Sequence, residues 1–119
     1  MKYRKQIASM LIAYRYAKKQ TQTKVANKLN VTFQQVQKYE IAKNGISSEK
    51  LLLFCDVYDL HLGSFQTGDP YDVLEGADIP IHDKEKAMQK IEKLEEVKYD
   101  QSRSDENLVR KSLNPRTYL

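Results

Sequence analysis

The stretch TQTKVANKLNVTFQQVQKYE, residues 21–40, is dense in carboxamide side chains, with glutamine at positions 22, 34, 35 and 37. A carboxamide donates and accepts hydrogen bonds through two neighbouring atoms, so it is suited to reading a polar surface. The chain shows no glycine loop that would cradle a phosphate and no nucleophile–base constellation. We therefore expect recognition by hydrogen bonding, no catalytic residue and no enzyme.

The residues that most often bind metals are too sparse to form a site. Cys55 is the only cysteine, so an internal disulfide is excluded and a reducing cytosol is the expected compartment. His61 and His82 lie far apart in the sequence with no metal-ligand partner in register, and we interpret them as surface or packing residues. Cys55 lies in an apolar stretch and is interpreted as a buried small hydrophobe. No metal and no cofactor is expected.

Length and charge indicate one small domain with an appendage. The 119 residues are 40% hydrophobic and 30% charged, with a net charge of +4. Residues 1–66 hold eleven Lys/Arg and four Asp/Glu, a net of +7, whereas residues 67–119 hold nine and twelve, a net of −3. This asymmetry is typical of a front half that meets a polyanion, although a solvated lysine-rich surface would look the same. No apolar run of about 18 residues and no signal peptide is found, so we expect no membrane contact.

Helical periodicity dominates residues 3–60. A first helix carries one apolar stripe at i, i+3, i+4, i+7 and i+10, formed by Ile7, Met10, Leu11, Tyr14 and Ala17. Thr21 is the expected N-cap of a second helix, and Asn30, which tolerates a left-handed backbone, is expected to end it. Thr32 and Gln35 have the spacing of a capping box for a third helix. Ser47 is expected to cap a fourth helix, SEKLLLFCDVYDL, apolar on most faces and therefore central, before a short fifth helix near residues 62–65.

The character of the chain changes after Gly68. Gly68, Pro70, Gly76 and Pro80 predict an acidic linker, after which Asp83 could cap a helix over residues 83–101. The apolar stripe of that helix is narrow and consists of Ala87, Ile91 and Leu94. It could pair with a second copy, bind another protein or remain part of a solvated tail. Leu108, Val109 and Leu113 predict a weak last helical turn or two. Since no internal repeat and no lasting strand pattern is found, the fold class is all-α.

The junction of the second and third helices has the features of a sharp helical corner. Two short helices joined by about three residues must cross steeply, which needs a small residue at the crossing, here Ala26, and a turn residue, here Asn30. Apolar residues fill both sides of the corner: Val25, Leu29, Val31, Val36 and Tyr39. This is the helix-turn-helix arrangement, in which the second helix of the pair enters the DNA major groove.

The same stretch resembles the helix-turn-helix of the Cro/repressor-type (Xre-like) family of bacterial and phage DNA-binding proteins. The positions that match the family pattern in register are Gln22, Ala26, Asn30, Val36, Tyr39 and Glu40. The resemblance covers about residues 3–66, with asparagine at position 30 in place of the usual glycine and a longer loop, EIAKNG, after the motif. It implies a lambda-repressor-like five-helix bundle over residues 1–67. Residues 68–119 would follow as a helical or partly disordered extension, a dimerisation or regulatory tail.

The resemblance also implies roles for individual side chains. The base-contacting positions would be Phe33, Gln34, Gln37 and Lys38, with Gln34 pairing to an adenine edge and Phe33 packing on a thymine methyl. The phosphate-contacting positions would be Gln22, Thr32, Lys43 and Asn44. Taken singly, Gln34 and Gln37 could be solvated glutamines, and Phe33 could be a core residue.

The implied function is a sequence-specific transcriptional regulator, a repressor that binds double-stranded DNA as a homodimer on a two-fold operator. Two alternatives remain open. The chain could be an antitoxin that autoregulates its operon and neutralises a toxin with its acidic tail, or a protein-interaction adaptor on the same fold. In each case we expect a cytoplasmic protein of a bacterium or phage.

Overall fold

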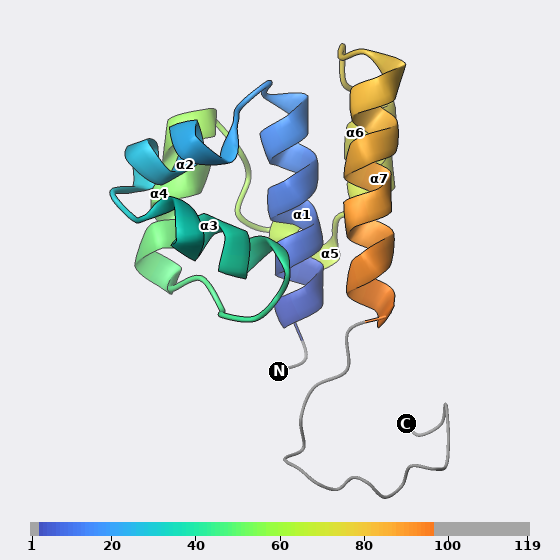
Figure 1. The fold of residues 1–119 in the computed structure, drawn as a ribbon. Coiled ribbons are helices and arrows are strands. Elements are labelled where there is room, and N and C mark those ends of the chain that lie inside the picture. Colours follow the sequence, from blue (N-terminus) through green and yellow to red (C-terminus); the bar gives the residue numbers. More distant parts are fainter. Residues whose placement is uncertain (1–2, 97–119) are drawn as a thin grey trace, which may run out of the picture.

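Helices make up most of the computed structural model, which describes residues 3–96 (Figure 1). Their bounds are α1 Arg4–Ala17, α2 Gln22–Leu29, α3 Phe33–Glu40, α4 Ser48–Tyr58, α5 Ser64–Thr67, α6 Pro70–Glu75 and α7 Ile81–Glu96. No strand occurs within these residues, so the all-α prediction is confirmed. In the same range, no helix is long and apolar enough to cross a membrane. The predicted turns at Leu108, Val109 and Leu113 lie outside the described residues.

The helical corner forms as the sequence predicts. Asn30 adopts the left-handed conformation, with φ 56° and ψ 47°, and its backbone N–H closes α2 onto the carbonyls of Ala26 and Asn27. Thr21, Thr32 and Ser47 begin α2, α3 and α4, each hydroxyl accepting from a backbone N–H three residues on, at 3.1, 3.0 and 3.2 Å. The predicted capping box at Thr32 is only half formed. The Thr32 hydroxyl accepts from the Gln35 backbone N–H, but within residues 3–96 the Gln35 side chain gives no return bond.

One hydrophobic cluster holds α2, α3 and α4 against α1. Its buried members include Met10, Leu11, Val25, Ala26, Leu29, Val36, Tyr39, Phe54 and Phe65. The prediction that α4 is central, because it is apolar on most faces, is wrong. Phe54 and Cys55 are buried, but Leu52 is 53% exposed and Val57 also reaches solvent. Within one chain α4 packs on one side only, because no helix of residues 3–96 covers its outer face.

A second cluster lies on the opposite side of α1, so the prediction of one apolar stripe on this helix is incomplete. It joins Ala8, Ile12 and Ala13 of α1 to Leu74 of α6 and to Ala87, Ile91 and Leu94 of α7. In Figure 1, α1 accordingly stands between the α2–α4 group and the α6–α7 pair. The stripe on α7 is buried within its own chain, so these three side chains are not free to form a seam with a second copy.

The predicted acidic linker contains a helix, α6, and that prediction is corrected. The Asp69 carboxylate accepts from the backbone N–H of Tyr71 at 2.9 Å, and Pro70 occupies the first helical position, where its missing N–H costs nothing. The proline that suggests a break is therefore a helix start. Similarly, Asp83 lies in the first turn of α7 and does not cap it, because the Pro80 carbonyl accepts from Asp83 and Lys84 and the helix begins at Ile81.

Candidate nucleic-acid interface

The outer face of α3 is a continuous surface of the residues that the sequence nominates for base contacts. Gln34, Gln37 and Lys38 are exposed, and Phe33 is 40% exposed at the first position of the helix. The opposite face carries Val36 and Tyr39, both buried in the core. An exposed Phe33 is off the core stripe, which removes the interpretation of this residue as a core side chain.

The four nominated phosphate-contacting residues lie at the borders of this face. Thr32 precedes α3, and its hydroxyl keeps its own hydrogen free to donate, because in the cap it acts as the acceptor. Lys43 and Asn44 follow α3, and their backbone N–H groups return to the Lys38 carbonyl at 3.0 and 3.3 Å. Lys43 is exposed. The loop after the helix is thereby held close to α3 despite its unusual sequence.

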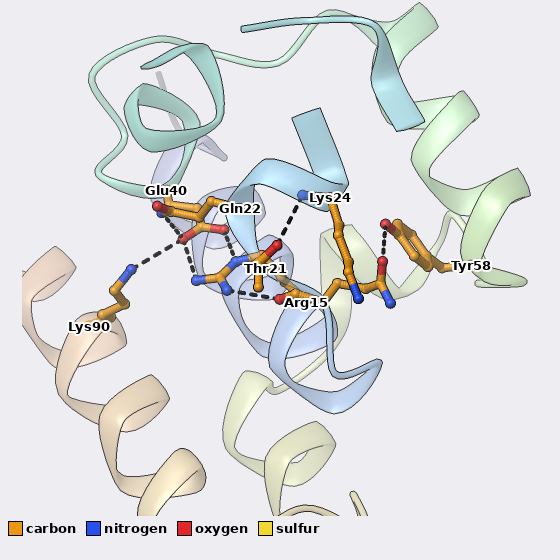
Figure 2. A network of polar contacts seen from close by, with 8 residues as sticks. Arg15, Thr21, Gln22, Lys24, Glu40, Tyr58 and Lys90 are labelled. Carbon is orange, nitrogen blue, oxygen red and sulfur yellow. Dashed lines mark hydrogen bonds and ion pairs between the residues drawn. The ribbon is translucent and has the colours of Figure 1, made fainter. Parts of the chain in front are cut away.

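Gln22 occupies the first position of α2 and is only half-buried. Its side-chain Nε2 donates to Oε1 of Glu40 at 2.9 Å (Figure 2). This bond fixes the carboxamide beside the end of α3 and still leaves one N–H and the amide oxygen available. Gln22 therefore stands pre-oriented at the positive end of α2, where an anion would be stabilised.

Glu40 is the centre of a polar network that sequence reasoning recognised only as a motif position. Arg15 donates from Nε to Oε2 at 2.6 Å and from Nη2 to Oε1 at 3.0 Å, and both side chains are more than nine-tenths buried. A third bond runs from Arg15 Nη1 to the Gln20 carbonyl at 3.1 Å. Burial lowers the pKa of Arg15, but the hydrogen bond and charge of Glu40 outweigh it and the net pKa is raised. Arg15 is therefore charged, and its two bonds to Glu40 fix α3 on α1.

The sequence analysis did not predict that Arg15 is buried, because a charged residue within the first helix suggests an exposed position. The position of Glu40 could have indicated a buried ion pair. Glu40 shares one face of α3 with Val36 and Tyr39, so its carboxylate must be buried and needs a cation. The sequence does not say which cation supplies it.

Helix α7 closes the other side of this site. Lys90 Nζ lies 3.5 Å from Glu40 Oε1, so a residue of α7 contacts the end of α3 (Figure 2). Between the two helices is an open cleft of about 260 Å³. It is lined by Gln22, Gln37, Glu40, Ile41, Lys90, Lys93 and Leu94. The cleft joins a nominated phosphate-contacting residue, a nominated base-contacting residue and two lysines of α7.

The remaining candidate groups stay apart from this interface. Cys55 is buried, and burial raises the pKa of its thiol. His61 is exposed and accepts a hydrogen bond at Nδ1 from the Gly63 backbone, and His82 is exposed on α7. Within residues 3–96, no group of three or more His, Cys, Asp or Glu side chains could hold a metal ion.

Comparison with known proteins agrees with the geometry of the corner. Residues 11–65 match a family model described as helix-turn-helix. The match runs from within α1 to α5 and contains both helices of the corner and every nominated contact residue. No curated protein and no solved structure gives a significant match to the chain.

Proposed function

We propose that this protein, whose residues 11–65 form a Cro/repressor-type (Xre-like) helix-turn-helix domain, is a sequence-specific transcriptional repressor that binds a two-fold operator as a homodimer. One observation carries the proposal. The polar face of α3 points to solvent while the apolar face of the same helix is buried, so Gln34, Gln37 and Lys38 are free to enter a major groove.

In this proposal α3 reads bases and its borders hold the backbone. Gln34 pairs with the N6 and N7 edge of an adenine, Phe33 packs on a thymine methyl, and Lys38 reaches a guanine or a phosphate. Phosphates are bound by Gln22, Thr32, Lys43 and Asn44, which flank the reading face at the starts of α2 and α3 and in the loop after α3. A repressor needs nothing more, since occupancy of a promoter blocks polymerase.

A homodimer is proposed because one such unit buries little surface on DNA, whereas two copies double both the base and the phosphate contacts. The surface that supports dimerisation is the outer side of α4 and the segment after it. Leu52 and Leu62, 53% and 45% exposed, share an open cleft there with Leu53 and Leu60. We propose that a second copy covers these leucines, while residues 1–67 bind DNA and residues 68–119 form an accessory unit.

Selection of binding sites from a random duplex pool tests the function. The wild-type protein is expected to enrich one sequence with two-fold symmetry and half-sites about one helical turn apart. A Gln34→Ala/Gln37→Ala variant should lose this enrichment, while a Gln89→Ala variant, which changes an exposed glutamine of α7, should keep it. Failure of the wild type to enrich any sequence would leave the adaptor alternative standing.

A further inference from the structure

We propose that α7 is part of the DNA interface and that Lys90 and Lys93 bind phosphates next to those held by Gln22. This inference rests on the proposed function and extends it to a helix outside the matched segment, because the family match ends at residue 65. It changes the role of the accessory unit from an appendage to a second wall of the binding surface.

The placement of α7 is fixed by burial. Ala87, Ile91 and Leu94 are 0, 2 and 3% exposed against α1 and α6, so the helix cannot rotate about its axis without exposing them. This register directs Lys90 and Lys93 toward the start of α2 and the end of α3, where both line the cleft with Gln22 and Gln37.

Two glutamates and two lysines in the second half of α7 lie on different flanks. Glu92 and Glu95 lie toward α6, where burial, followed by the charges of these two glutamates, raises the pKa of Tyr71. Lys90 and Lys93 lie toward α3, whereas Lys84, near the start of α7, donates to the Glu75 carbonyl of α6. The accessory half is acidic in sum, yet the flank that it shows to α3 is basic.

Neighbouring acidic side chains do not neutralise the charges of Lys90 and Lys93. Among residues 3–96, Glu40 is the only acidic residue that lines the cleft, and Arg15 already pairs with it through two bonds. Lys90 is 41% exposed and approaches Glu40 at a looser 3.5 Å, and Lys93 forms no ion pair within residues 3–96. The local sum of Arg15, Lys90, Lys93 and Glu40 is therefore two positive charges beside the start of α2, a site that attracts anions.

A duplex is the anion that fits this arrangement. Gln37 lies on the reading face and Gln22 at the start of α2, so the cleft opens beside the groove that α3 would enter. A strand held by Gln22 would pass Lys90 and Lys93 within the reach of lysine side chains, which bind phosphates as mobile point charges.

The test measures the affinity for a random 30-bp duplex and for the selected operator across a fourfold rise in salt. The Lys90→Gln/Lys93→Gln variant is expected to reduce the slope of log affinity against log salt by about 0.9 per lost phosphate, or about 1.8 per subunit. Over that salt range, each wild-type subunit would lose about tenfold more affinity than the variant. Lys90→Arg/Lys93→Arg should preserve the wild-type slope.

The matched control is Lys24→Gln/Lys28→Gln, which removes two exposed lysines one helical turn apart from α2 and causes the same loss of charge. Lys24 lies on the opposite side of the network from Lys90 (Figure 2). The salt dependence of the affinity of this control variant should therefore have the same slope as that of the wild type. Circular dichroism is the check that each variant is folded. Lys93→Glu, which breaks no ion pair within residues 3–96, should weaken DNA binding further.

Two results would overturn the inference and are distinguishable. If the wild type binds DNA but Lys90→Gln/Lys93→Gln has an unchanged slope or binds more tightly, α7 lies off the duplex and only this inference falls. If the wild type binds no duplex at any salt, the proposed function falls with it.

Discussion

The guanidinium of Arg15 and the carboxylate of Glu40 form a two-point ion pair that joins the end of α1 to the last residue of α3. Both side chains are buried, and Gln22 and Lys90 approach the same carboxylate from α2 and α7. The Glu40 side chain therefore connects α3 to α1, α2 and α7. This junction holds α3 in place together with the hydrophobic core.

Removal of the Arg15 guanidinium from this junction should lower the free energy of unfolding. Arg15→Met leaves the buried Glu40 with the hydrogen bond from Gln22 and with Lys90, at a looser 3.5 Å, as its cation, and we expect a loss of about 3–5 kcal/mol in the free energy of unfolding, measured by urea denaturation. Arg15→Met/Glu40→Met should recover much of that loss, because no charge is then left unpaired. Lys18→Met, at an exposed position after α1, is the control. A loss below about 1 kcal/mol for Arg15→Met would contradict the buried pair.

The left-handed backbone at Asn30 predicts a substitution pattern opposite to ordinary helix propensity. Asn30→Gly should be neutral or slightly stabilising, whereas Asn30→Val should cost about 1–2 kcal/mol, because a β-branched side chain is strained at φ 56°. Asn27→Val, the same change three residues earlier in a regular helix, should cost only about 0.5 kcal/mol or less. Thermal unfolding of the three variants measures the difference. Equal costs for both valines would exclude the left-handed cap.

Removal of a base-contacting side chain should weaken binding in a way that depends on the DNA sequence, whereas removal of a phosphate-contacting side chain should not. Gln34→Ala is expected to cost about 1–3 kcal/mol of binding at one operator position and to relax the preference there. Lys43→Ala should weaken every sequence to a similar extent. Competition gel shifts with single-base operator variants separate the two patterns. Uniform weakening by Gln34→Ala would remove its assignment as a base reader.

The exposed leucines beside α4 predict the dimer surface. Leu52→Ser/Leu62→Ser should shift the protein from dimer to monomer in analytical ultracentrifugation and weaken operator binding, since each half-site is then bound alone. Ile81→Ser, which changes an exposed apolar residue at the start of α7, should leave the dimer intact. A wild-type protein that remains monomeric at micromolar concentration would contradict the proposed homodimer.

Buried protonated groups predict a decline in stability at alkaline pH. Burial raises the pKa of the Cys55 thiol above its ordinary 9.0 and that of Tyr58 above 10.0. The folded state therefore retains protons that the unfolded chain releases, so stability is full below about pH 9.0 and falls as pH rises further. Cys55→Ala should move the onset toward pH 10.0, as measured by urea midpoints between pH 7 and 10.5. An unchanged onset in Cys55→Ala would show that the thiol does not contribute.

The sequence by itself determined the elements whose causes are local. Thr21, Asn30, Thr32 and Ser47 mark helix ends because capping and left-handed backbone depend on a few adjacent residues. The apolar spacing around Ala26 likewise predicted the corner. The exposed face of α3 was predicted from the positions that lie off its apolar face. These features need no knowledge of what lies beyond the next turn of chain.

Only the tertiary structure decided how the second half of the chain is used. Periodicity identified Ala87, Ile91 and Leu94 as a stripe but could not name its partner, which is the second face of α1 in the same chain. Pro70 pointed to a linker and instead begins α6, because the docked neighbours make a short helix stable. The approach of Lys90 to Glu40 spans fifty positions, a separation at which sequence spacing carries no geometric information and packing alone sets the distance.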